Sequence, residues 1–138
     1  MTEANIISGI ILTLPIVKGK AEAWRRFCQE LSGTRRLEHE AARLQQGITC
    51  ERLALIETAY GATAVTTFEA VDLSLALNQL RISKQPFDRW YRQQIQILHG
   101  IDLTSYELFS PQIPLPDNQE LLFEWILPPT KNNGRKSG

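Results

Sequence analysis

The amino-acid sequence predicts one α+β domain with a four-stranded antiparallel sheet and helices on one face. Two observations predict this class. Runs of strand-forming residues and runs with helical spacing of apolar residues follow one another in the order strand, broken helix, strand, strand, helix pair, strand. The chain has 138 residues, about the size of a single domain with one core. We therefore expect a single sheet to organise the whole protein.

The charge and cysteine content exclude several function classes. Fifteen Lys and Arg balance fifteen Asp and Glu, so no net field attracts a polyanion, and we expect neither nucleic acid nor a membrane as partner. The longest apolar run, residues 6–17, is shorter than the roughly twenty residues that span a bilayer, and no basic cluster precedes it as in a signal peptide. Cys28 and Cys50 form no CxxC pair, so we expect two small buried hydrophobes, no metal site and no cofactor. These features predict a cytoplasmic protein.

Residues 6–17 form the first predicted strand. Both alternating sets of side chains in this run are mainly apolar. A strand with one solvent-exposed face would alternate apolar and polar residues, so we expect both faces of this strand to be covered.

Residues 18–47 predict a helix that is broken at Ser32-Gly33. The first half has a clear apolar stripe at positions i, i+3, i+4 and i+7, made by Trp24, Phe27, Cys28 and Leu31. The second half repeats the spacing more weakly through Leu37, Ala41 and Leu44, and Gly47 is placed as its C-terminal stop. His39 lies between two glutamates in this half and is predicted on a solvated face. Both halves should therefore pack by their apolar stripes.

Residues 48–58 and 62–70 read as a β-hairpin, with Gly61 available for a positive φ angle in the turn. Residues 72–83 then predict a helix with an apolar stripe. Pro86 suits the first position of a second helix, and Gly100 is placed to end it. The broad apolar face of this second helix comprises Phe87, Trp90, Tyr91, Ile95 and Leu98. A short last strand is expected at residues 104–110.

Prolines become frequent after Ser110. We therefore predict a domain over residues 1–110 and a proline-rich C-terminal extension over residues 111–138 with a disordered end. Within the extension, residues 120–126 (ELLFEWI) remain strongly apolar. An exposed apolar strand is an aggregation hazard. We therefore expect Leu122, Phe123 and Trp125 to dock on this domain or on a partner.

This order of elements is the split βαβ arrangement of a ferredoxin-like fold. Helices then cover one face of the sheet and leave the other bare, although the first strand is apolar on both faces. The simplest cover is a second copy packed across a two-fold axis, which predicts a homodimer.

A family resemblance supports the same picture. The segments PIVKGKAEAWRRF, LQQGITCERLALIET and SKQPFDRWYRQQIQILHGIDL resemble the dimeric α/β-barrel superfamily, and within it a group of small bacterial proteins with no assigned activity. The resemblance spans about residues 6–109 and implies a ferredoxin-like dimeric α/β barrel. The wider superfamily includes cofactor-free monooxygenases, haem-degrading monooxygenases, isomerases and stress-responsive proteins, and the fold alone does not choose among them.

Four residues are candidates for a site. Some haem-degrading members of the superfamily use a tryptophan and a histidine from this region, which directs attention to Trp90 and His99. Nine residues on a straight helix place two side chains about 180° apart, so both face one pocket only if the helix ends or bends before His99. His99 is the candidate general base because the imidazole pKa lies near neutrality. Trp90, Tyr91 and Arg43 are candidates for ligand binding, since a guanidinium at a pocket mouth pairs well with a carboxylate or phosphate.

Three functions fit these features. The first is a homodimer that binds a small hydrophobic or aromatic molecule in a cavity between sheet and helices. The second is a non-catalytic structural or protein-interaction module whose interior is filled by its own side chains. The third is a cofactor-free monooxygenase or isomerase. No dinucleotide, P-loop, hydrolase-elbow or zincin motif is present to decide among them.

Overall fold

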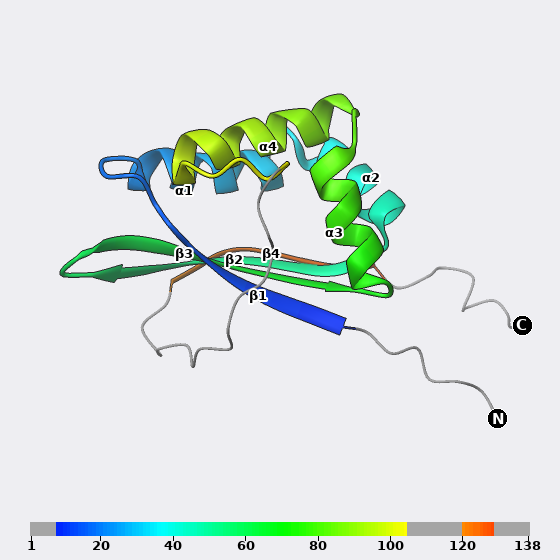
Figure 1. Ribbon diagram of the computed structural model, residues 1–138, viewed down its shortest axis with the longest axis horizontal. Helices are drawn as coiled ribbons and strands as arrows, with labels where there is room; N and C mark the ends of the chain where they lie inside the picture. Colours follow the sequence, from blue (N-terminus) through cyan, green and yellow to red (C-terminus); the bar gives the residue numbers. More distant parts are fainter. Residues whose placement is uncertain (1–7, 105–119, 129–138) are drawn as a thin grey trace, which may run out of the picture.

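The computed structural model describes residues 8–104 and 120–128. Four helices lie together on one face of a four-stranded antiparallel sheet (Figure 1). This confirms the predicted α+β class and the one-sided placement of the helices. In chain order the elements are β1 (Ser8–Pro15), α1 (Ala21–Ser32), α2 (Arg36–Gln46), β2 (Ile48–Thr58), β3 (Gly61–Ala70), α3 (Leu73–Ile82), α4 (Pro86–His99) and β4 (Glu120–Ile126).

The first three strands have the split βαβ arrangement. β3 lies between β1 and β2 and pairs antiparallel with each of them, so β1 and β2 run parallel to one another. The long connection between these parallel strands is the helix pair α1 and α2. This part of the sheet agrees with a ferredoxin-like fold.

The fourth strand of the described sheet comes from the apolar segment at residues 120–126. β4 pairs antiparallel with β2, at the edge of the sheet opposite β1. Its side chains Leu122, Phe123 and Trp125 pack against the core that lies under the helices. Of the strand expected at residues 104–110, all but Thr104 lies outside the described residues, as does the predicted disordered end.

Glycine and proline end or begin several elements where the sequence predicts. Gly47 and Gly100 follow α2 and α4 with φ angles of 74° and 71°, the left-handed conformation that glycine adopts without strain. Pro86 occupies the start of α4, where its missing N–H costs no helical hydrogen bond. The hairpin between β2 and β3 turns at Gly61, whose φ is 131°.

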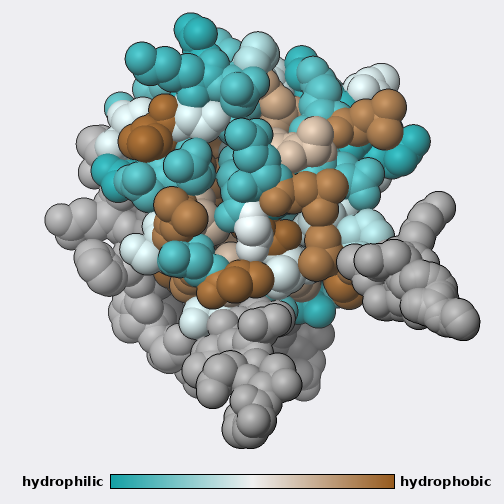
Figure 2. Space-filling model, turned by 90° about the vertical axis from the view of Figure 1, so that its right-hand side faces the viewer, coloured by the Kyte–Doolittle hydropathy of each residue, from teal (hydrophilic) through white to brown (hydrophobic). Residues whose placement is uncertain are grey.

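Apolar residues lie on both faces of the sheet. The main core fills the space between the sheet and the helices. On the opposite face, Ala54, Ile56 and Val65 form a smaller buried cluster with Ile11 beside it. At the end of the molecule where α2 and α3 lie, apolar side chains also reach the surface among hydrophilic ones (Figure 2). The predicted dimeric barrel stays a prediction.

Candidate functional site

The most unusual feature of the core is a buried carboxylate, Glu51, in the middle of β2. Side chains alternate along a strand, so Glu51 points to the same face as Leu53 and Leu55, under the helices. Its cross-strand neighbours are Phe68 on β3 and Trp125 on β4. The side chain is 0% exposed. An ionised carboxylate in such a place requires partners.

Three side chains from two helices bind this carboxylate. Arg43 donates from Nε to Oε1 of Glu51 at 2.7 Å, and Nε2 of His39 lies 2.7 Å from the same oxygen. His39 and Arg43 are four residues apart on α2 and therefore lie on one face of that helix. The hydroxyl of Tyr91, on α4, donates to Oε2 at 3.0 Å. Both oxygens of Glu51 are thus satisfied.

Further hydrogen bonds extend this cluster to the start of α4. The Nη1 atom of Arg43 donates to Oε1 of Gln46 at 3.0 Å, and Nε2 of Gln46 donates to Oδ1 of Asp88 at 3.0 Å. The hydroxyl of Ser83 donates to the other oxygen of Asp88 at 2.6 Å. One chain of hydrogen bonds therefore joins β2, α2, α4 and the turn before α4. We call Glu51, His39, Arg43, Tyr91, Gln46 and Asp88 the buried polar cluster.

The charges of Glu51 and Arg43 compensate one another. Burial alone would raise the pKa of Glu51, but Arg43 and the hydrogen bond from His39 lower it to about 2. Burial would lower the pKa of Arg43, but the charge of Glu51 raises it instead. Burial and the neighbouring Glu51 carboxylate raise the pKa of Tyr91 well above its usual value. Glu51 and Arg43 are therefore an ion pair and Tyr91 is a neutral donor.

Aromatic rings surround the cluster. His39 makes edge-to-face contacts with Phe87, Phe123 and Trp125, with ring centroids 5.1 to 6.0 Å apart. The Arg43 guanidinium lies 4.6 Å from the centroid of the Tyr91 ring. These rings line a low-dielectric site in which the polar groups bind one another.

The cluster corrects three expectations about α2. His39 was expected on a solvated face, but it is 1% exposed, and Arg43 was expected at a pocket mouth, but it is 0% exposed. The stripe expected to pack is instead on the surface, since Leu37 is 69% and Leu44 49% exposed and Ala41 is exposed too. The physical reason is the Glu51 carboxylate, because it requires polar partners from α2, which His39 and Arg43 supply on the face opposite the apolar stripe.

The remaining candidates are engaged by neighbours. Trp90 is half-buried and packs between the ring of Phe27, at 5.6 Å, and the guanidinium of Arg35, at 4.0 Å. His99 is 8% exposed, and its Nδ1 donates to the carbonyl of Pro15 at 3.0 Å. Burial lowers the pKa of His99. The geometry does not show His99 and Trp90 facing a common pocket, and ligand binding at these residues stays a prediction.

One small cavity is described between the sheet and the helices. The cavity described there has a volume of about 20 Å³, about the size of one water molecule. Its walls include Leu12, Phe68, Tyr91 and Ile95. The described interior is filled by side chains at this point.

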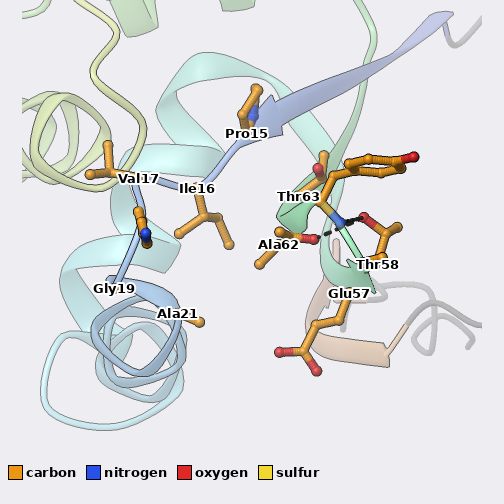
Figure 3. Close-up of a pocket in the computed structure, with 13 residues that line it drawn as sticks. Pro15, Ile16, Val17, Gly19, Ala21, Glu57, Thr58, Ala62 and Thr63 are labelled. Atoms are coloured by element: carbon orange, nitrogen blue, oxygen red, sulfur yellow. Dashed lines mark hydrogen bonds between the residues drawn. The ribbon is translucent and has the colours of Figure 1, made fainter.

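A larger pocket lies at the surface, between the loop that follows β1 and the tip of the β2–β3 hairpin (Figure 3). Its volume is about 680 Å³. Val17 and Gly19 lie on one side, and Glu57 and Thr58 on the other. Pro15, whose carbonyl accepts from His99, also lines this pocket. His99 therefore contacts the wall of a surface pocket.

No protein-family model, no curated protein and no solved structure matches this chain. The resemblance to the dimeric α/β-barrel superfamily consequently stays a prediction. Within residues 8–104 and 120–128, no helix is both long enough and apolar enough to cross a bilayer. The same residues include no group of three or more His, Cys, Asp or Glu side chains placed to hold a metal ion. Cys28 and Cys50 are buried, at 1% and 3% exposed, as expected.

Proposed function

We propose that this protein is a non-catalytic structural or protein-interaction module. The observation that carries the proposal is the filling of the space between sheet and helices, where the described cavity holds about 20 Å³. A drug-sized ligand needs a pocket of roughly 300 to 1,000 Å³. Two of the candidate ligand-binding residues, Arg43 and Tyr91, bind Glu51 inside this core. Their polar groups are used to hold β2, α2 and α4 together.

A thermal-shift screen of small hydrophobic and aromatic compounds tests this function. A compound that binds only the folded state raises its melting temperature. We expect no compound to raise the melting temperature of the wild-type protein more than that of His99→Ala, each measured against its own ligand-free value. A compound that raises the melting temperature only when His99 is present would contradict the proposed module. It would support a ligand-binding or catalytic function instead.

A second function is favoured by the surface pocket of Figure 3. Its volume of about 680 Å³ lies within the range of small-molecule sites, and Ile16 and Ala62 give it an apolar floor. In this alternative, a small hydrophobic or aromatic molecule binds beside the hairpin rather than between sheet and helices. Ala62→Phe introduces a ring into this pocket. A compound that raises the melting temperature of the wild type but not of Ala62→Phe would support this alternative over the module.

A further inference from the structure

We infer that the outward face of α2, together with the neighbouring α3, is the interface through which two copies of this chain form a homodimer. The inference rests on the proposed function in one respect, because a module with a filled interior must bind its partner through its outer surface. The apolar residues involved are Leu37, Ala41 and Leu44 on α2, Leu75 and Ile82 on α3, and Val71 just before α3. We call these residues the α2–α3 surface.

The face of α2 that points away from the core is apolar. Leu37, Ala41 and Leu44 are spaced at i, i+4 and i+7, so they form one narrow stripe on the helix. His39, Arg43 and Gln46 lie on the opposite side and bind within the buried polar cluster. The apolar stripe of α2 is therefore largely exposed, since Leu37 is 69% and Leu44 49% exposed.

The neighbouring helix α3 also exposes apolar residues. Leu75 and Ile82 are also seven residues apart on one side of their helix, and they are 52% and 56% exposed. Val71 is 56% exposed. Residues of α2 and α3 contact one another. The view onto this end of the molecule shows apolar side chains at several places, with hydrophilic ones between them (Figure 2).

The area of the α2–α3 surface is sufficient for a dimer. The six side chains together expose roughly 500 Å², within the range of the largest apolar patch on a typical monomer and large enough to mark a contact site. Two copies packed face to face would remove roughly 1,000 Å² from water, the size at which specific interfaces begin. The net charge of zero means that two copies do not repel one another.

The stripe on α2 is also self-complementary. Leu37 and Leu44 lie nearly equally far from Ala41 in the sequence, so an antiparallel pair of α2 helices about a two-fold axis near Ala41 places Leu37 against Leu44 of the second copy. A closed dimer requires a patch that is complementary to itself in this way. Ala41 is small enough for two helix axes to approach to about 8 Å. These properties favour a second copy of this chain over an unrelated partner.

Light scattering on the full chain tests the interface. We expect the wild type to have twice the chain mass of 15.7 kDa at micromolar concentration. The double variant Leu44→Lys, Leu75→Lys should have the mass of one chain with an unchanged circular dichroism spectrum, because the two side chains are 49% and 52% exposed. The control Ile97→Lys changes a residue on α4 that is 45% exposed, and it should remain a dimer. A monomeric wild type, or a dimer that survives the double variant, would overturn the interface.

A cross-linking experiment tests the position of the two-fold axis. Under mild oxidation, Ala41→Cys should form a covalent dimer on a non-reducing gel, since the two introduced thiols face one another. Gln93→Cys, on the exposed side of α4, is the matched control and should remain monomeric on that gel. Cys28 and Cys50 are buried and do not interfere. Failure of Ala41→Cys to cross-link, or equal cross-linking of both variants, would contradict the axis.

The two proposals fail in different ways. A compound that raises the melting temperature through His99 would overturn the module and leave the interface unaffected. A wild-type mass of one chain without any such compound would overturn the interface and leave the module unaffected.

Discussion

Helices α1 and α2 follow one another in the sequence and pack in the same layer, but they bury opposite kinds of side chain. α1 buries its apolar stripe of Trp24, Phe27, Cys28 and Leu31, each at most 2% exposed. α2 exposes its apolar stripe and buries a polar one. The stripe on the surface is Leu37, Ala41 and Leu44, and the buried polar side chains are His39, Arg43 and Gln46.

The difference lies in what each helix meets. α1 faces an apolar part of the core, so burying its apolar stripe gains the transfer free energy of those side chains. α2 lies over Glu51, and a buried carboxylate without a partner costs about 3 to 5 kcal/mol, more than the roughly 1.5 to 3 kcal/mol that burying one leucine returns. Periodicity shows that a segment is a helix, but the opposite surface decides which face of the helix is buried.

The largest expected effect comes from removing the carboxylate that determines the orientation of α2. Glu51→Ala leaves the charge of Arg43 buried without its partner, so we expect a loss of about 3 to 5 kcal/mol in the free energy of unfolding. Glu57→Ala is the control on the same strand. Its side chain is 60% exposed and lies 3.9 Å from Arg25, so it should cost no more than about 0.5 kcal/mol. Urea denaturation measures both, and equal losses would contradict the role given to Glu51.

A second pair of variants compares the two helices directly. Leu31→Ala on α1 removes a side chain that is 0% exposed and should cost about 2 to 5 kcal/mol, because it leaves a cavity. Leu44→Ala on α2 removes one that is 49% exposed and should cost less than about 1 kcal/mol. The Leu44 measurement should be made at a concentration at which the chain is monomeric, so that the α2–α3 surface does not contribute. If Leu44→Ala costs as much as Leu31→Ala, α2 buries the face that the sequence predicts.

Acid should lower the free energy of unfolding by protonating Glu51, the carboxylate that holds α2. The pKa of this group is about 2 in the folded protein against an unperturbed value of 4.5, so the unfolded chain binds the proton more tightly. Stability from Glu51 is complete above pH 4.5 and is lost as the pH falls toward 2, by about 3 kcal/mol in all. Carboxyl carbon NMR of Glu51 should show a titration midpoint near 2. A midpoint above 4 would mean that Arg43 and His39 do not hold the carboxylate ionised.

Much of the fold could be predicted because it depends on local signals. The helix starting at Pro86, the stops at Gly47 and Gly100 and the turn at Gly61 all follow from backbone chemistry that each residue carries by itself. The one-sided placement of the helices follows from the element order. The pairing of β4 with β2 could not be predicted, since an apolar segment shows that it docks but not which sheet edge it joins.

The buried polar cluster was missed because its members are far apart in the sequence. Arg43 bonds Glu51 eight residues later, and Tyr91 bonds it from forty residues away. One signal was present. Glu51 occupies the inward-facing set of a strand whose other inward positions include Leu53 and Leu55, and a charged residue there demands a buried partner. His39 and Arg43, four residues apart on the preceding helix, were the available donors.

The smallest expected effect tests the link from α4 to the same carboxylate. Tyr91→Phe keeps the ring but removes the hydroxyl that donates to Oε2 of Glu51. Among the described residues, that oxygen then keeps the longer 3.4 Å contact with Nη2 of Arg43. A hydrogen bond to a charged group contributes about 1.5 to 3 kcal/mol, so we expect a loss near the lower end of that range. Tyr60→Phe removes the same hydroxyl from a residue that is 100% exposed and should leave the urea midpoint unchanged. Equal midpoints for the two variants would show that α2 alone holds Glu51 and that the Tyr91 hydroxyl does not stabilise the carboxylate.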